Sequence, residues 1–268
     1  MQRFNEIQNP AAVALSRTST SRNVLRTFSI FELIKSRGEP LGVPEISAHL
    51  GIPRSTTYDL IRTLIQADYL EKFADAKCGL GRKLYELGAA YKGQSPLLHH
   101  GGEVVRALRD EIRETVQLSV LDNGLMFVVL KEEGLQPVRI ISNVGTRVPC
   151  NWAAAGKVLL AHLGAEEAQQ IMSGTVRPSP TGKAITDIEK LSSILARTRR
   201  AGYGIEVGEV NAHSGCVAAP VFDVTGNCVA ALSIAVPEQR LEGRDRDTLI
   251  VAVRSAAGVL SKRIAQLF

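Results

Sequence analysis

The feature that most constrains this chain is a pair of helical apolar patterns that meet at Gly51. In VPEISAHL (residues 43–50) a proline suits the first turn of a helix, and the following glycine can adopt the left-handed conformation of a tight turn. A longer helical stripe over residues 21–37 comes first and ends at a glycine and a proline. PRSTTYDLIRTLIQADY (residues 53–69) follows, and its apolar face consists of Leu60, Ile61, Leu64 and Ile65. Two short helices at a glycine turn, after a longer one, predict a helix-turn-helix.

The next segments predict a wing. YLEKF (residues 69–73) and GRKLYEL (residues 81–87) look like the strands of a hairpin joined by ADAKCGL, although the second could equally begin a helix at Leu84. The outward face of residues 53–69 offers cations for phosphates and hydrogen-bonding groups for base edges, as a recognition helix does. The same side chains would also suit a helix that merely faces solvent. The candidate DNA-binding residues are Arg54, Ser55, Thr56, Tyr58, Asp59 and Arg62.

The rest of the chain predicts a second domain. Residues 1–20 are polar without a sustained period and predict a flexible arm. The winged helix-turn-helix takes residues 21–92 and the second domain residues 93–268, with a linker near residues 92–110, where KGQSP interrupts the helical pattern. Antiparallel hairpins with helices between them predict an α+β fold. The expected strands are residues 116–121, 125–133, 138–144, 216–223 and 228–236, and the expected helices are residues 153–163, 165–174, 187–203 and 244–268.

Composition narrows the class of function. The chain has 268 residues, 45% of them hydrophobic, which is enough to bury a core in each of two domains. Residues 1–92 hold 13 Lys and Arg against 9 Asp and Glu, a net of +4 out of +5, which points weakly to a polyanion partner there. No apolar run approaches the roughly 18 residues that span a membrane, and no signal peptide is evident, so we expect a cytoplasmic protein without membrane contact. Four cysteines without a CxxC pair favour reduced thiols, and no cofactor is expected.

The stretch EVGEVNAHSGCVAAPVFD (residues 206–223) gathers groups that could support chemistry. A Cys-dependent hydrolase would use Cys216 as nucleophile, His213 as base and Glu206 as orienting acid. The histidine lies only three residues before the cysteine, in a glycine-containing turn, and the chain has no GxSxG elbow. A metal-responsive protein would use His213 and Cys216 with Glu206 or Asp223, a mixed set that zinc accepts, although the spacing of paired ligands is weak.

A loop of small residues, AAAGKVLL, enters the expected helix over residues 153–163. It is not a phosphate-binding loop of the Walker type, because the required upstream glycine is missing and Val158 follows Lys157 where a hydroxyl residue is needed. Free backbone N–H groups and the helix dipole at such a start can still hold a carboxylate.

Several segments together resemble one protein family. SRNVLRTFSIFELI, PEISAHLGIPRSTTYDLIRTLIQADYLEK and GRKLYELG resemble the winged helix-turn-helix of the IclR family of bacterial transcriptional regulators. GTRVPCNWAAAGKVLLAHL, AGYGIEVGEV and CVAAPVFDVTGNCVAALSIAVP resemble its effector-binding domain, so the resemblance runs from about Ser21 to the C-terminus. It implies a GAF-like or profilin-like antiparallel sheet, and a repressor or activator rather than an enzyme. The implied partners are double-stranded operator DNA, a small acidic or aromatic organic effector, and further copies of the chain in a homodimer or homotetramer.

The resemblance also implies where the effector binds. Glu206 stands where family members often have Asp, and Ala235 stands where a second serine is common. Asn151 occupies a position that is often His, and Trp152 is either an aromatic wall of the site or a half-buried core residue. No catalytic residue and no metal ligand is expected. The implied effector-binding residues are Ala154, Ala155, Gly156, Glu206, Cys216 and Ser233.

Overall fold

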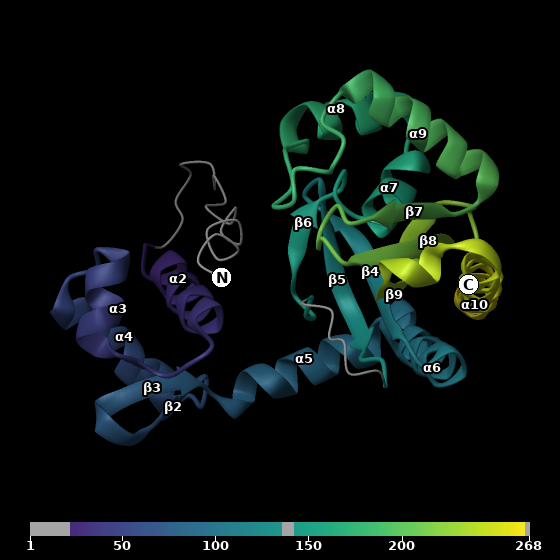
Figure 1. The fold of residues 1–268 in the computed structure, drawn as a ribbon. Coiled ribbons are helices and arrows are strands. Elements are labelled where there is room, and N and C mark those ends of the chain that lie inside the picture. Colours follow the sequence, from purple (N-terminus) through teal and green to yellow (C-terminus); the bar gives the residue numbers. More distant parts are fainter. Residues whose placement is uncertain (1–21, 136–141, 266–268) are drawn as a thin grey trace. The chain divides into compact units, whose positions relative to one another are not determined.

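The computed structural model describes residues 22–135 and 142–265 (Figure 1). The chain divides between Gln94 and Ser95 into two compact units, each with its own core. The expected flexible arm over residues 1–20 lies outside the described residues. So do residues 138–141 of the expected strand over 138–144, while residues 142–144 are described and are not in a strand.

The N-terminal unit contains the expected helix-turn-helix. Its elements are α2 (Arg22–Arg37), β1 (Leu41–Gly42), α3 (Val43–Leu50), α4 (Arg54–Gln66), β2 (Leu70–Lys72), the 3-10 turn η1 (Ala74–Ala76), β3 (Lys77–Leu80) and α5 (Arg82–Gln94). Gly51 ends α3 at φ 62°, which confirms the left-handed turn. Ile30, Ile46 and Ile61, one from each helix, are buried in a common core. The sequence pattern therefore defines this unit well up to the end of α4.

The wing differs from the sequence prediction. Its second strand is β3, which pairs antiparallel with both β1 and β2, whereas GRKLYEL begins α5 at Arg82. The prediction of a strand over residues 81–87 is wrong, and the helical alternative is correct, two residues earlier than expected. Glycines explain the misassignment. A side chain at Gly79 would meet the Phe73 ring at 2.7 Å, and one at Gly81 would clash with the Asp68 carbonyl, so both positions have a packing role rather than a loop role.

The C-terminal unit is built on a six-stranded antiparallel sheet with the order β6-β5-β4-β9-β8-β7 (Figure 1). The turn between β4 and β5 has Asn123 and Gly124 at positive φ, as the expected DNG hairpin requires. The strands are β4 (Thr115–Asp122), β5 (Leu125–Glu132), β6 (Arg147–Pro149), β7 (Gly204–Val207), β8 (Ser214–Phe222) and β9 (Cys228–Pro237). The helices are α6 (Pro96–Ile112), α7 (Ala154–Ala161), α8 (Ala165–Thr175), α9 (Ile188–Ala201), η2 (Glu238–Leu241) and α10 (Gly243–Ala265). The short elements β6, β7 and η2 were not expected.

The KGQSP segment interrupts the helical pattern where α5 ends and α6 begins. The Ser95 side chain caps α6 by accepting a hydrogen bond from the Leu98 N–H, and Pro96 occupies the first turn. Val104, Val105 and Leu108 of α6 are buried against the sheet. Most of the expected linker region over residues 92–110 is therefore part of the C-terminal unit.

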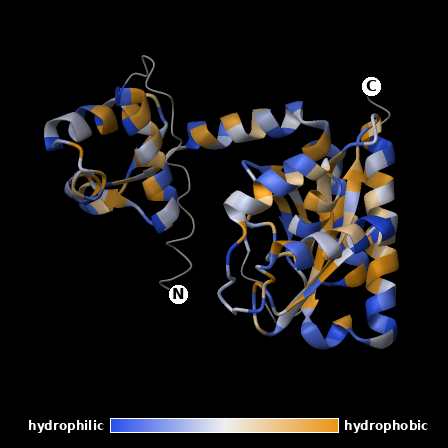
Figure 2. Ribbon diagram, turned by 90° about the horizontal axis from the view of Figure 1, so that it is seen from above, coloured by the Kyte–Doolittle hydropathy of each residue, from blue (hydrophilic) through white to orange (hydrophobic). Residues whose placement is uncertain are grey.

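The two faces of this sheet differ in chemistry. One face carries Val116, Leu118 and Ile234, and it packs on α6 and α10 in the main apolar core. Figure 2 shows hydrophobic residues concentrated along these strands. Because side chains alternate along a strand, the neighbouring residues Thr115, Gln117, Ser119 and Ser233 point to the other face, and all four are buried. That face lies toward α7, which contacts β8 and β9.

Candidate functional site

The outward face of α4 carries the residues expected to bind DNA. Arg54, Ser55, Tyr58, Asp59 and Arg62 are exposed, and Thr56 is half-buried. The inward side is buried through Ile61 and also through Thr57, whose hydroxyl donates to the Pro53 carbonyl at 3.1 Å. Arg62 pairs with Asp59 at 3.0 Å, but both side chains are mostly exposed. An exposed pair of this kind contributes little to stability, so Arg62 can exchange Asp59 for another anion.

The wing adds cations that the sequence did not single out. Lys72 ends β2 and Lys77 begins β3, so the two lysines lie on either side of the exposed turn η1. Both side chains are exposed. Asp75 and Ala76 in that turn adopt positive φ. Lys72 lies in the predicted wing strand YLEKF, whereas Lys77 was expected in the connecting segment ADAKCGL, and recognition of β3 as a strand would have placed it in the wing sheet.

In the C-terminal unit, strand register brings the polar residues of four strands together. Glu206 of β7 pairs with Cys216 of β8, which pairs with Ala235 of β9, which pairs with Thr115 of β4. The next pairs on the same face join Ala218, Ser233 and Gln117. Glu206, Cys216 and Ser233, which are far apart in sequence, therefore lie on one patch of the sheet, where Glu206 and Ser233 are buried and Cys216 is half-buried. Ala235 leaves an apolar position in the middle of it.

The start of α7 faces this patch. Ala154, Ala155 and Gly156 are all buried, and α7 begins after Ala153 without a side-chain cap among the described residues. Gly156 is required for close approach, since a Cβ there would lie 2.6 Å from Cys150 Cα and would also clash with the Cys150 carbonyl. The first turn of α7 thus offers backbone N–H groups beside the polar face of the sheet.

A buried charge cluster completes the patch. Lys157 has a side chain only 2% exposed, and its Nζ donates to Glu209 Oε1 at 2.5 Å. Glu206 accepts a hydrogen bond from the Glu209 backbone N–H at 3.0 Å. Burial, reinforced by the charge of Glu209, raises the pKa of Glu206 to about 7 although Lys157 opposes the rise. Two carboxyl groups thus share one buried ammonium, and near neutral pH the protonated form of Glu206 is well populated.

Cys216 and His213 do not form a catalytic or metal-binding pair. Desolvation and the charge of Glu206 raise the pKa of the Cys216 thiol far above its usual range, which disfavours the thiolate that a nucleophile needs. The His213 side chain is 89% exposed and lies 3.9 Å from Glu238 on the surface. In the ranges 22–135 and 142–265, no cluster of three or more His, Cys, Asp or Glu side chains is arranged to hold a metal ion.

Asn151 and Trp152 anchor the segment between α8 and α9. The Asn151 amide donates to the carbonyls of Arg177 and Ile185, and Trp152 Nε1 donates to the Arg177 carbonyl at 2.8 Å. Trp152 is 1% exposed, so it is fully buried in the core rather than half-buried as expected. Ser119 Oγ on the polar face of the sheet has no hydrogen-bond partner among the described residues, and the same holds for Asn151 Oδ1 and Glu209 Oε2.

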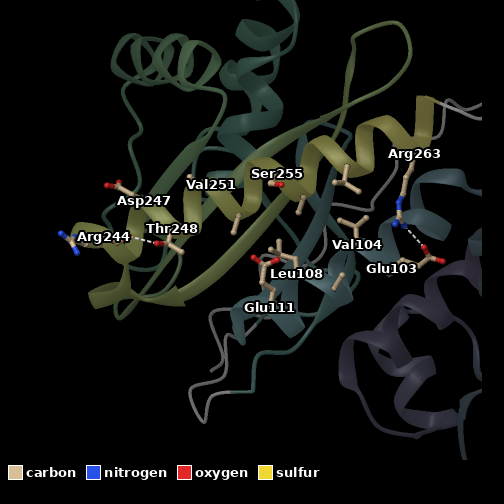
Figure 3. A pocket seen from close by; sticks show the side chains of 14 residues that line it. Glu103, Val104, Leu108, Glu111, Arg244, Asp247, Thr248, Val251, Ser255 and Arg263 are labelled. Atoms are coloured by element: carbon tan, nitrogen blue, oxygen red, sulfur yellow. Dashed lines mark hydrogen bonds and ion pairs between the residues drawn. The ribbon is translucent and has the colours of Figure 1, made fainter.

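A separate groove runs between α6 and α10 on the other face of the sheet (Figure 3). It has a volume of about 730 Å³ and is lined by apolar side chains such as Leu108 and Val251, with Glu103 and Arg263 paired at 2.7 Å near one end. It contains none of the residues of the polar patch.

The fold, the exposed polar face of α4 and the polar patch of the C-terminal sheet are typical of a transcriptional regulator with a DNA-binding helix-turn-helix and a separate C-terminal effector-binding domain. Residues 89–262 match the bacterial transcriptional regulator IclR C-terminal domain, and residues 23–72 match the IclR helix-turn-helix domain. The chain therefore belongs to the IclR family of bacterial transcriptional regulators.

Curated relatives and solved structures agree with this assignment. The chain is 30% identical to the transcriptional regulator KdgR of Escherichia coli K12 over 243 residues, which cover 90% of this chain and 92% of that protein. It is 32% identical to the transcriptional repressor AllR of Klebsiella pneumoniae over 221 residues, covering 81% and 80%. An IclR homolog from Microbacterium hydrocarbonoxydans, solved with 4-hydroxybenzoate, aligns with a TM-score of 0.81 and 25% identity over 90% of this chain and 98% of that one.

These relatives are regulators and not enzymes, and they give no support to a hydrolase or a metal-responsive protein. The Thermotoga maritima IclR structure shares the fold, with a TM-score of 0.77 and 23% identity over 90% of this chain and 98% of that one. Of the helices in the described part of the chain, none combines the length and the apolar character needed to cross a membrane.

Proposed function

We propose that α4 enters the major groove of operator DNA and that the wing contacts the neighbouring backbone. The division of α4 into a buried apolar side and an exposed polar side is the observation that carries this proposal. Arg54 and Arg62 would bind phosphate or guanine, Tyr58 would pack on sugar or a thymine methyl, and Lys72 and Lys77 would bind phosphates. The proposed major-groove residues are Arg54, Ser55, Thr56, Tyr58, Asp59 and Arg62.

We propose that the polar patch of the C-terminal unit binds the effector, a small organic acid. Buried polar groups are normally hydrogen-bonded, and a ligand can supply the partner that a buried atom of this sheet face, such as Ser119 Oγ, does not find among the described residues. The carboxylate and phenol of 4-hydroxybenzoate, bound by one structural relative, illustrate a fitting chemistry. The proposed contacts are the start of α7 (Ala154, Ala155, Gly156) and the sheet residues Glu206, Cys216 and Ser233.

We also propose that the protein acts in the cytoplasm as a homodimer or homotetramer. α2 exposes Val24 and Phe28, which lie one turn apart, and α5 exposes Tyr85, Leu87 and Tyr91. In the described structure, no residue of α5 is buried. Apolar helix surfaces of this kind favour association, and a symmetric pair of recognition helices reads two half-sites instead of one.

The test combines operator binding with ligand response in the full-length protein. Arg54→Ala is expected to weaken operator binding by about 1–3 kcal/mol, since it removes a contact to phosphate or base, while the thermal shift with organic acids is unchanged. Ser233→Ala is expected to retain operator binding but to lose the effect of the organic acid on it. A gel-shift titration at low salt, with and without the organic acid, measures operator binding and its response to the ligand, and a thermal-shift screen of aliphatic and aromatic acids measures ligand binding itself.

Lys35→Ala is the matched control for the arginine, because it removes an exposed cation from α2, outside the proposed interface. Equal loss of affinity in Lys35→Ala and Arg54→Ala would contradict the recognition-helix assignment. An unchanged ligand response in both Ser233→Ala and Glu206→Ala would show that the effector binds elsewhere.

A further inference from the structure

The ion pair between Lys157 and Glu209 is unusual in its asymmetry. Lys157 is held rigidly in α7, where every residue is buried, and its ammonium lies in the interior of the domain. Glu209 belongs to the segment between β7 and β8, and its side chain is 12% exposed. The cation is therefore fixed inside the domain, whereas its anionic partner comes from a segment near the surface.

Glu209 is only half satisfied in this position. Its Oε1 accepts from Lys157, but its Oε2 is buried and has no hydrogen-bond partner among the described residues. Desolvation raises the pKa of the Glu209 carboxyl even with the Lys157 charge beside it. A carboxylate buried in this way is held less favourably than one that is fully hydrogen-bonded.

The main chain of Glu209 is anchored independently of its side chain. Its N–H donates to Glu206 Oε2 at 3.0 Å, and its carbonyl accepts from Thr181 Oγ1 at 2.8 Å. The Glu209 side chain can therefore rotate toward solvent while the backbone stays in place. Its departure would leave an oxyanion-sized space beside the ammonium, next to the polar patch.

We propose that Lys157 is the anion-binding group of the effector site and that Glu209 occupies it in the ligand-free protein as an internal substitute for the effector's carboxylate. This inference rests on the proposed effector function and names its ligand chemistry, a carboxylate. Exchange of one carboxylate for another leaves the charge beside Lys157 unchanged, so no further ion has to be buried. It also releases the Glu209 side chain, which gives the effector a direct means of altering the segment between β7 and β8.

Chemical rescue tests the proposal without knowledge of the natural effector. Glu209→Ala leaves Lys157 buried without its anion, and its melting temperature is expected to fall. Formate or acetate should restore much of that loss, whereas chloride at equal ionic strength and uncharged acetamide should not. Wild-type protein, in which Glu209 competes, is expected to need at least about tenfold more acetate for a half-maximal shift.

Two further variants make the result decisive. Glu114→Ala is the matched control, because it removes a similarly buried carboxylate from a different ion pair, the one with Arg240 at 2.6 Å, and leaves Lys157 and Glu209 in place. The double variant Glu209→Ala with Lys157→Met should lose all acetate-specific stabilisation. If Glu209→Ala does not fold, Glu209→Gln serves in the same comparison, because its side chain lacks the negative charge with which Glu209 competes with acetate for Lys157.

Acetate stabilisation of Glu209→Ala that is no greater than that of chloride, or no greater than in Glu114→Ala, would overturn the proposal. The pair would then be a fixed structural contact. This result would leave the effector function intact if organic acids still altered operator binding. Conversely, acetate rescue without any effect of organic acids on operator binding would retain the anion site and refute the effector function.

Discussion

Replacement of Glu206 by glutamine should make the protein more stable at alkaline pH. Glu206 is 5% exposed on β7 and faces Glu209 from the adjoining segment, Lys157 from α7 and Cys216 from β8. Glutamine has the same shape and can still accept the hydrogen bond from the Glu209 N–H. It cannot ionise, so the variant removes the cost of burying a second carboxylate beside Glu209.

The pKa of Glu206 sets both the size and the pH range of the effect. Burial raises it from its ordinary 4.5 to about 7, and each pKa unit corresponds to about 1.36 kcal/mol, so ionisation costs the folded state roughly 3 kcal/mol. Because the folded state binds this proton more tightly than the unfolded state, wild-type stability falls as pH rises from 4.5 to about 7. The stability difference between Glu206→Gln and wild type should therefore grow by about 3 kcal/mol over that window and stay constant above it.

Urea unfolding followed by tryptophan fluorescence measures this difference. Trp152 is the only tryptophan of the chain and is buried in the C-terminal unit, so its fluorescence reports the unfolding of that unit alone. The exposed Glu167→Gln in α8 serves as the control and should show no comparable pH dependence. A stability difference between Glu206→Gln and wild type that is the same at pH 5 and pH 8 would refute the assigned electrostatics.

Two substitutions test the support of the site. Gly156→Ala should destabilise the C-terminal unit by about 2–3 kcal/mol in the same urea assay, because the added Cβ overlaps Cys150. The control Gly174→Ala in α8, where a Cβ meets open space in the described structure, should be neutral or stabilising, and equal effects of the two substitutions would contradict the close approach of Gly156 to Cys150. Asn151→Ala should lower the free energy of unfolding by about 2 kcal/mol and increase amide hydrogen exchange in the segment between α8 and α9, because it removes two hydrogen bonds to that segment. Unchanged hydrogen exchange in this segment would show that Trp152 alone anchors it.

The parts of the fold that the sequence predicts are those set by local chemistry. Gly51 and the DNG turn need positive φ, and such positions are readable from residue type alone. The wing was misassigned because Gly79 and Gly81 look like loop residues, although their role is close packing against Phe73 and Asp68. A glycine required by a neighbour distant in sequence carries the same letter as a glycine required by a turn, so only the fold distinguishes them.

The candidate site, too, could be predicted from the sequence only in part. Resemblance to a family placed Glu206, Cys216 and Ser233 in one site, and strand register brings them to one face of the sheet. The pairing of Lys157 with Glu209 joins residues 52 positions apart and depends on the path of the segment between β7 and β8. No local sequence pattern predicts this ion pair, since a lysine after Gly156 and a glutamate after Gly208 are both residues that usually lie on a surface.

The division of the sheet into two faces relates stability to sensing. Residues such as Leu118 and Ile234 bury apolar area against α6 and α10, and this face stabilises the domain whether or not a ligand is bound. The opposite face buries Glu206 with an unfavourable charge and Ser119 with a hydroxyl that has no hydrogen-bond partner in the described part of the chain, so this face destabilises the ligand-free domain. A ligand that completes those hydrogen bonds removes part of that cost only in the folded state, which makes this face the one whose stability responds most to an effector.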